Sequence, residues 1–186
     1  MPSYMHDSLQ LRRASPSLAM DRSPSSTQIW QWNCCGYRRK RPVLQSALSM
    51  LETATLAVAL QETGGPAKLQ GYQVFHSSRG DKSRVSTLVK RNVATIEHDL
   101  EEKVIENVFV EILTGKKGES NIFLLNIYSP PKQRKVRFRA VINKALKIAE
   151  NQALVIVGDF NAHHPERGYP KEDPKGRQLW EDIHNL

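Results

Sequence analysis

Short apolar runs that end in polar residues recur along this chain. The clearest is Ala153–Val157, which is β-branched in its second half and is closed by Gly158. A short apolar run bounded by glycine is typical of a buried strand, because a helix would need a longer periodic segment. Asp159 and Asn161 follow at once. Both residue types form turns with their own backbone, and both suit an active site at the carboxyl end of a strand, so the two interpretations stay open here.

Six further segments have the apolar pattern of strands. They cover residues 29–33, 56–60, 72–75, 84–90, 104–113 and 122–127. The last two are expected to pair as an antiparallel hairpin with a longer loop. Three of the segments carry polar side chains at or just past their ends, namely Asn33, Glu62 and Tyr128. A carboxamide, a carboxylate and a phenol are therefore delivered to strand ends.

Apolar residues at helical spacing predict three helices. The first begins at Pro42, because proline suits the first turn of a helix, and continues to Leu51. The other two cover residues 141–149 and 176–183.

The composition is that of an ordinary globular protein, with 39% hydrophobic and 25% charged residues among 186. Residues 1–27 show no helix or strand period, so we expect an unstructured leader there and one domain over residues 28–186. No apolar run approaches the length of a transmembrane helix, and no apolar stretch follows Arg12 and Arg13 as in a secretory signal. We therefore expect a nuclear or cytoplasmic protein without a membrane partner.

The net charge of +8, from 27 Lys and Arg against 19 Asp and Glu, favours an anionic partner. Nucleic acid is the commonest such partner, and a solvated basic surface is the alternative. Two basic runs stand out, at residues 38–41 and 132–139. The candidate contacts to DNA are Arg38, Arg39, Lys132, Arg134 and His163.

The cysteine and glycine motifs exclude several kinds of site. Cys34 and Cys35 are the only cysteines, and neighbours rarely form a relaxed disulfide, so we expect free thiols and no zinc site. The chain has no Walker loop, no dinucleotide fingerprint and no Gly-x-Ser-x-Gly. No small-molecule cofactor is expected, and the oligomeric state is left open.

The polar strand ends form a set with a defined chemistry if their strands lie side by side. The set contains two carboxylates, two carboxamides and one phenol, from Glu62, Asp159, Asn33, Asn161 and Tyr128. Oxygen ligands without cysteine suit Mg²⁺ or Mn²⁺. Such an ion polarises a phosphate, while a carboxylate orients or deprotonates the attacking water. The set therefore favours phosphodiester hydrolysis.

Four motifs in order resemble a known superfamily. They are Trp-Gln-Trp-Asn-Cys-Cys-Gly at residues 30–36, Leu-Gln-Glu-Thr at 60–63, Asn-Ile-Tyr-Ser-Pro-Pro-Lys at 126–132 and Val-Gly-Asp-Phe-Asn-Ala-His-His at 157–164. This order resembles the endonuclease/exonuclease/phosphatase superfamily, which includes pancreatic deoxyribonuclease and apurinic endonucleases. The residues in these motifs, together with Lys175-Gly176-Arg177, are similar to those of the endonuclease domain of arthropod non-LTR (LINE-type) retrotransposons. The similarity extends over about residues 28–186.

The resemblance implies a four-layer α/β/β/α sandwich of the DNase I-like kind. It implies that Glu62 ligates Mg²⁺ and that Asn33 supports the metal. It further implies that Asp159 aligns or activates the water, and that Asn161 and Tyr128 face the scissile phosphate. The implied activity is the nicking of target DNA, which exposes a 3′ hydroxyl for reverse transcription.

The chain also departs from the family pattern. Family members end with a Ser-Asp-His-type motif on a late strand, and no Ser-x-His follows Asn161 here. We therefore expect a domain that is incomplete at its C-terminus, with impaired activity. Cys35 stands where arginine is frequent in the retrotransposon branch, and Arg167 where tryptophan is expected. The alternatives are an inert or nucleic-acid-binding remnant and a phosphatase of the same superfamily.

Overall fold

The computed structural model describes residues 28–50, 55–115, 120–133 and 136–186. The expected leader, residues 1–27, and the candidate DNA contact Arg134 lie outside these residues.

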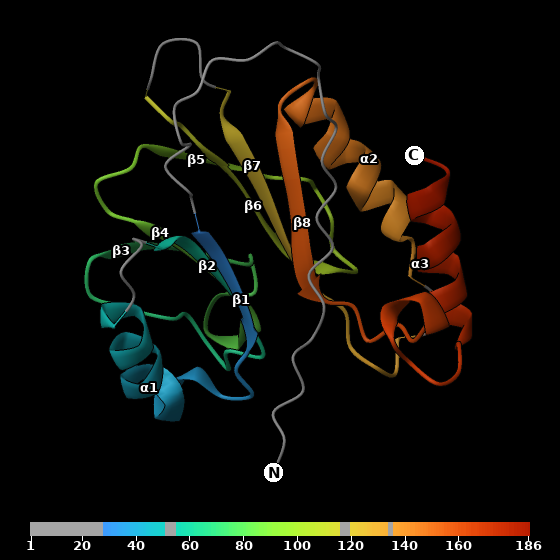
Figure 1. The fold of residues 1–186 in the computed structure, drawn as a ribbon, viewed down its shortest axis with the longest axis horizontal. Coiled ribbons are helices and arrows are strands. Elements are labelled where there is room, and N and C mark those ends of the chain that lie inside the picture. The colour runs from blue at the N-terminus through green and yellow to red at the C-terminus, as the bar shows by residue number, and fades with distance from the viewer. Residues whose placement is uncertain (1–27, 51–54, 116–119, 134–135) are drawn as a thin grey trace.

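Within the described residues, eight strands form two four-stranded sheets (Figure 1). The first sheet has the order β1 (Gln28–Asn33), β2 (Thr55–Gln61), β4 (Val85–Lys90), β3 (Tyr72–His76), and the second has the order β5 (Thr95–His98), β6 (Glu106–Ile112), β7 (Ile122–Tyr128), β8 (Ala153–Asp159). The pairs β1–β2 and β7–β8 are parallel, and all other pairs are antiparallel. The predicted hairpin of β6 and β7 is confirmed.

The assumption that the strands at 29–33, 56–60, 122–127 and 153–157 lie side by side is wrong. The first two pair in one sheet and the last two in the other, and the two sheets pack face to face. The core between them contains Ala57, Val89, Val110 and Leu124 from four different strands. A continuous apolar run is buried on both faces whether a helix or a second sheet covers it, so the sequence pattern did not separate these arrangements.

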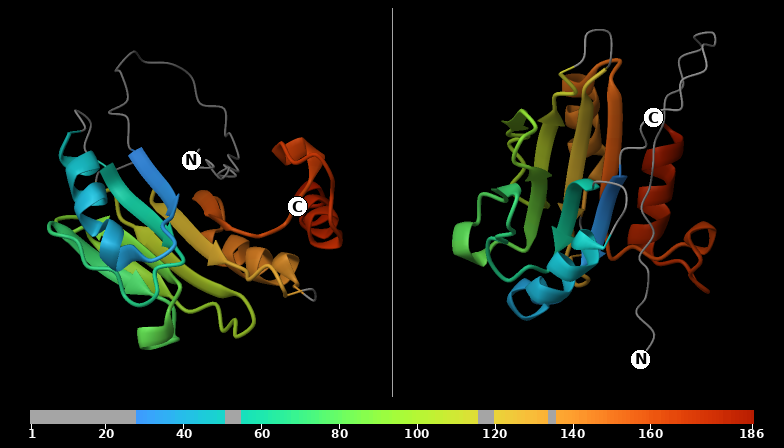
Figure 2. Two further views of the ribbon diagram at one scale, coloured as in Figure 1. Left: turned by 90° about the horizontal axis from the view of Figure 1, so that it is seen from below. Right: turned by 60° about the vertical axis from the view of Figure 1, so that its left-hand side comes forward.

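In the part of the chain that the structure describes, three helices cover the outer faces of the two sheets. Helix α1 (Tyr37–Ser49) lies on the first sheet, whereas α2 (Phe138–Ala149) and α3 (Pro174–His184) lie on the side of the second (Figures 1 and 2). Helix α1 packs on its sheet through Tyr37 and Leu44, and α2 and α3 share one core with β7 and β8. The predicted α/β/β/α sandwich is therefore confirmed.

Several predicted boundaries are wrong. Helix α1 begins five residues before Pro42, which lies inside it, because Gly36 turns the chain at φ +94° and Tyr37 can bury its ring. Strand β5 was not predicted, since two of its four residues are exposed, two are half-buried, and the segment carries little apolar pattern. Two short 3₁₀ turns, Gly80–Lys82 and Pro165–Arg167, lie in the loops.

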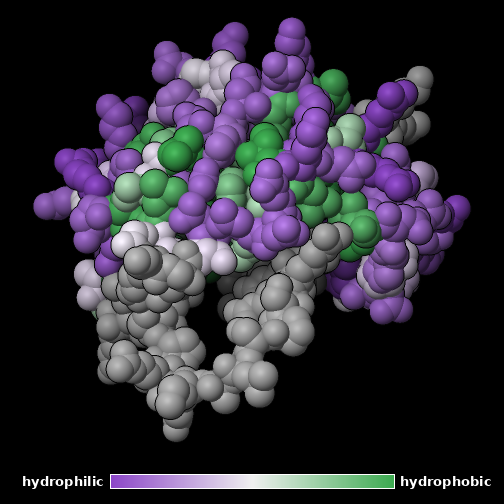
Figure 3. Space-filling view, turned by 90° about the horizontal axis from the view of Figure 1, so that it is seen from above, coloured by the Kyte–Doolittle hydropathy of each residue, from purple (hydrophilic) through white to green (hydrophobic). Residues whose placement is uncertain are grey.

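The surface mixes polar and apolar residues. Seen from above, hydrophobic areas are separated by hydrophilic side chains (Figure 3). The exposed large apolar residues include Val43 on α1, Ile96 on β5 and Ile148 on α2, which are ordinary isolated surface positions. Among the described helices, none is both long and apolar enough to cross a bilayer.

Candidate active site

Four strand ends meet at one end of the sandwich. Asn33 is paired with Gln61 across β1 and β2, and Tyr128 is paired with Asp159 across β7 and β8. Parallel neighbours end at the same edge of a sheet, so each pair brings its polar residues together. The two edges are then joined, because the Asn33 Nδ2 donates a 2.7 Å hydrogen bond to the Asp159 Oδ2.

The loops after β1 and β2 continue the strand pairing. The backbone N–H of Cys34 donates to the carbonyl of Gln61 at 2.9 Å, and that of Gly36 to the carbonyl of Glu62 at 2.7 Å. These bonds fix the position of Asn33 relative to Glu62.

Glu62 itself has φ +53°, a left-handed conformation that a non-glycine residue adopts at a cost of about 1 kcal/mol or more. Both expected cysteine thiols are free, with Cys34 buried and Cys35 exposed.

Tyr128 connects β7 to Glu62. Its hydroxyl donates to the Glu62 Oε1 at a long 3.5 Å, and its ring is buried. Burial and then the nearby Glu62 carboxylate raise the pKa of Tyr128 above its ordinary value of 10.0. The phenol is therefore a neutral hydrogen-bond donor at physiological pH.

The loop after β8 combines the two interpretations that its sequence left open. The Asp159 Oδ1 accepts a hydrogen bond from the backbone N–H of Asn161 at 3.1 Å, which is turn chemistry. The Asp159 Oδ2 faces Asn33 at the strand edge. Asn161, at φ +46°, donates its side-chain amide to the carbonyl of Ser129 at 3.1 Å. Asp159 and Asn161 also line a small recess with Arg167.

Lys175 holds the neighbouring loop, which follows β7. It is 7% exposed, and its Nζ donates to the carbonyls of Ser129 at 3.4 Å and Pro130 at 3.1 Å. Burial lowers the pKa of Lys175 to about 8, against the opposing effect of the Asp159 and Asp173 charges. The same carbonyl of Ser129 therefore accepts from Lys175 and from Asn161.

The predicted DNA contacts are more dispersed. Arg38 and Arg39 are exposed in the first turn of α1, and Lys132 is exposed beyond the end of β7. His163 is exposed, stacks on Tyr169 with 4.3 Å between ring centroids, and holds its Nδ1 3.7 Å from Asp173. His163 is therefore directed toward the start of α3.

Two residues beside this site were not selected from the sequence. The Arg84 guanidinium lies 4.6 Å from the centre of the Tyr128 ring, and its Nε donates to the Glu106 Oε1 at 2.7 Å. The only sequence signal was that Glu106 interrupts the apolar face of its strand. Beside this pair, a cavity of about 480 Å³ is lined by His76, Ser77, Arg79, Glu97, His98 and Glu106 among others.

Glu62 and Asn33 offer the few oxygen ligands that suit Mg²⁺, rather than a complete coordination shell of protein side chains. Among the described residues, no group of three or more His, Cys, Asp and Glu is placed to hold an ion. Mg²⁺ in phosphoryl-transfer sites keeps several waters and binds through one or two carboxylates together with substrate phosphate. Glu62 and the amide of Asn33 are donors of this kind.

Comparison with known proteins supports the resemblance that the motifs indicated. A family model described as "Endonuclease-reverse transcriptase" matches residues 122–186, a segment that contains Tyr128, Asp159 and Asn161. No curated protein sequence is significantly similar to the chain.

Solved structures show the same fold. The endonuclease domain of TRAS1, a telomere-specific non-LTR retrotransposon, matches with a TM-score of 0.69 and 20% identity over 86% of this chain and 70% of that one. Truncated TDP2 of Caenorhabditis elegans matches with a TM-score of 0.50 and 17% identity over 78% of this chain and 66% of that one. A second structure of TDP2 from C. elegans matches with a TM-score of 0.51 and 15% identity over 78% of this chain and 50% of that one. The resemblance to the endonuclease/exonuclease/phosphatase superfamily, and to a retrotransposon endonuclease in particular, is confirmed.

Proposed function

We propose that the chain is a divalent-metal-dependent endonuclease that hydrolyses phosphodiester bonds in DNA, in the manner of target-site nicking by a retrotransposon endonuclease. The observation that carries the proposal is the hydrogen bond from Asn33 to Asp159. It joins the polar ends of two parallel strand pairs from different sheets, so carboxylates, amides and a phenol lie at one edge.

Asp159 orients or deprotonates the attacking water in this proposal. Its two oxygens accept from Asn33 and from the backbone of Asn161, so the carboxylate is held in one orientation. Asn161 uses one amide hydrogen on Ser129, and its second amide hydrogen is the donor for a phosphoryl oxygen. Tyr128 is a neutral donor to the same phosphate.

Glu62 and Asn33 are the residues that would hold Mg²⁺ or Mn²⁺. The bound ion would neutralise phosphate charge and polarise a phosphoryl oxygen. Glu62 is only partly buried, so its carboxylate is open to solvent, and the Asn33 Oδ1 accepts one hydrogen bond, from the Cys35 N–H at 3.2 Å.

DNA is the proposed partner. The excess of eight positive charges attracts a polyanion, and Arg38, Arg39 and Lys132 expose cations on its surface. The phosphates of bound DNA would neutralise these exposed positive charges.

Nicking of supercoiled plasmid tests the proposal. The wild-type chain is expected to convert supercoiled to relaxed circles in Mg²⁺ slowly, in line with the impaired activity expected from its sequence, and to stop in EDTA. Asp159→Ala is expected to lower that rate by about 100-fold or more. Glu181→Ala, on the exposed side of α3, is the control and is expected to behave as wild type.

Two other outcomes identify the alternatives. A chain that shifts DNA in a binding assay but never nicks it is a nucleic-acid-binding remnant. A chain that hydrolyses a soluble phosphomonoester but leaves plasmid intact is a phosphatase of the same superfamily.

A further inference from the structure

Arg84 occupies a position directly beside the proposed catalytic edge. It immediately precedes Val85, which is paired with Gln61, and its carbonyl accepts a 3.3 Å hydrogen bond from the N–H of Thr63. Glu62 lies between these two contacts along the chain. The Arg84 side chain then crosses to the second sheet and places its guanidinium over the Tyr128 ring, 4.6 Å from the ring centre.

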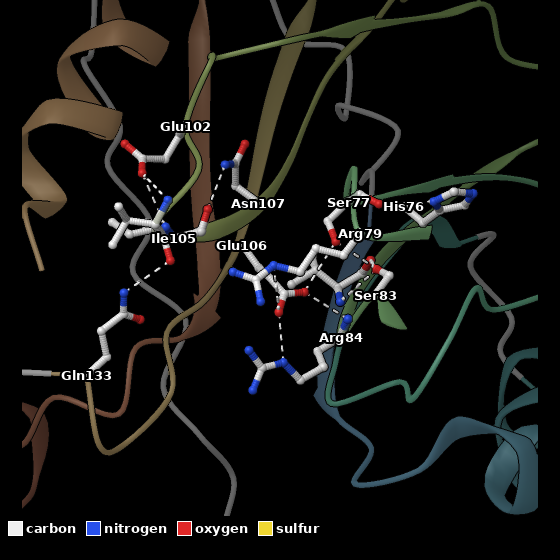
Figure 4. Close-up of polar contacts among 12 residues, drawn as sticks. His76, Ser77, Arg79, Ser83, Arg84, Glu102, Ile105, Glu106, Asn107 and Gln133 are labelled. Carbon is white, nitrogen blue, oxygen red and sulfur yellow. Dashed lines mark hydrogen bonds and ion pairs between the residues drawn. The ribbon is translucent and has the colours of Figure 1, made fainter. Parts of the chain in front are cut away.

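A buried carboxylate fixes this arginine. Glu106 has a side chain that is 2% exposed, and it begins β6 opposite Tyr128. Its Oε1 accepts from the Arg84 Nε at 2.7 Å, and its Oε2 accepts from the backbone N–H of Arg84 at 2.9 Å and from the Ser77 hydroxyl at 3.2 Å. Glu106 therefore holds both the main chain and the side chain of Arg84 (Figure 4).

The cluster carries an excess of positive charge. Arg79 also approaches Glu106, with 3.5 Å from its Nε to the Oε1, so two guanidinium groups face one carboxylate. The Arg84 side chain remains 34% exposed. In Figure 4 the terminal nitrogens of Arg84 point away from Glu106, which binds only the Nε edge. Among the described residues, Glu106 is the one carboxylate that Arg84 bonds.

A guanidinium held in this way is suited to phosphate. Its planar fork matches two phosphate oxygens, and holding the Nε edge and the ring face in advance reduces the entropy lost on binding. A purely structural ion pair would need neither an exposed terminal edge nor a second arginine. We propose that Arg84 contacts a backbone phosphate of the bound DNA on the Tyr128 side of the site, and that Glu106 is its positioning residue. This inference rests on the DNA binding that the proposed function includes.

Replacing both charges together tests the proposal without unpairing Glu106. The double variant Arg84→Gln with Glu106→Gln keeps the net charge of the chain and leaves two amides that can bond each other. Binding of a fluorescent duplex oligonucleotide is measured by anisotropy in EDTA over a series of salt concentrations. The expected result is about tenfold weaker binding at low salt, with the slope of log K against log salt concentration shallower by about 0.9, the value for one phosphate contact.

Two further variants complete the experiment. Arg84→Lys keeps the charge but not the fork, so it is expected to retain the salt slope while losing about fivefold in nicking rate. Arg91→Gln removes an exposed arginine at the other end of β4 and is expected to change neither nicking nor the salt slope. Circular dichroism and thermal unfolding establish that each variant is folded.

The outcomes separate this inference from the proposed function. If wild type nicks DNA and the folded double variant keeps the wild-type salt slope, Arg84 makes no phosphate contact and the inference is wrong. If wild type binds DNA without nicking and the double variant loses the contact, the inference stands and the nuclease proposal fails. If wild type does not bind duplex DNA, the inference is also overturned.

Discussion

The side chains of Asn33 and Asp159 are 126 residues apart in sequence, and the Asn33 Nδ2 donates to the Asp159 Oδ2 at 2.7 Å. This bond joins β1 of the first sheet to β8 of the second at their carboxyl ends. Asp159 is only 7% exposed, so its negative charge depends on nearby donors rather than on water. The bond therefore serves the packing of the two sheets and also the orientation of the proposed base.

Asn33→Ala removes this donor from a nearly buried carboxylate. The expected cost is about 1–3 kcal/mol in the free energy of unfolding, measured by urea denaturation, because a hydrogen bond to a charged group is lost. The nicking rate is expected to fall about tenfold or more, since Asp159 then loses its orientation. An Asn33→Ala variant that unfolds at the wild-type urea midpoint would show that the two sheets do not depend on this bond.

Tyr128→Phe removes only the hydroxyl that reaches Glu62. The bond is long, at 3.5 Å, so the free energy of unfolding is expected to change by less than about 1 kcal/mol. Nicking is expected to fall by about 10-fold to 100-fold if the phenol donates to the phosphate. Because burial and Glu62 raise the pKa of Tyr128, the pH dependence of nicking between about pH 7 and pH 9 should have the same shape in both proteins. A shift of that profile would identify the phenol as a titrating group.

The sequence predicted which polar residues lie at strand ends, but it did not predict how those strands are arranged in the two sheets. Glu62 and Asp159 were visible because each comes after an apolar run, and Asn33 because it ends an alternating segment; both patterns mark strands wherever they lie in a fold. The assignment of those strands to two sheets was not visible, because a run buried on both faces looks the same under a helix or under another sheet. Arg84 and Lys175 were not selected, since a cation becomes informative only when its partner across the fold is known.

The packing of α3 depends on Gly176, which belongs to the Lys175-Gly176-Arg177 motif and whose structural role was not predicted from the sequence. The N–H of Gly176 donates to the Asp173 Oδ1 at 2.6 Å, which caps the helix. A Cβ at this position would lie 1.8 Å from the carbonyl oxygen of His163, which is backbone and cannot turn aside. The start of α3 therefore lies directly on the loop that follows Asp159 and Asn161.

Gly176→Ala is accordingly expected to cost about 3 kcal/mol, because the helix must move off the His163 backbone. Nicking should fall with it, since the loop carrying Asn161 loses its support. Thermal unfolding measures the stability, and Glu181→Ala on the exposed side of α3 provides the control at about 0.5 kcal/mol or less. A Gly176→Ala protein as stable as the control would mean that the contact relaxes without cost.

A buried amide pair holds the two sheets together behind the site. Gln61 and Asn126 are both fully buried, and the Gln61 Nε2 donates to the Asn126 Oδ1 at 2.6 Å. Asn126 also donates to the carbonyls of Leu60 and Ser86. Such a network stabilises a core only when every member has partners.

Asn126→Leu should therefore destabilise the chain by about 2–4 kcal/mol, since it leaves the Gln61 amide without its acceptor inside the core. The double variant Gln61→Leu with Asn126→Leu is expected to lose less than the sum of the two single variants, which a double-mutant cycle in urea measures. Additive losses would mean that the two amides act independently.

Lys175 provides a prediction about pH. Its pKa is lowered by burial from 10.5 to about 8, so the unfolded chain binds this proton more tightly than the folded one. Below about pH 8 both states are protonated and the full cost of burying the charge is present. Between about pH 8 and pH 10.5 the folded state releases its proton first, so the free energy of unfolding rises by up to about 3 kcal/mol from this group. Lys175→Met, which cannot titrate, should lack this rise, and the difference between the two urea midpoints across this range isolates it from other groups. Parallel curves for wild type and Lys175→Met would show that the ammonium group is not buried as its contacts with Ser129 and Pro130 indicate.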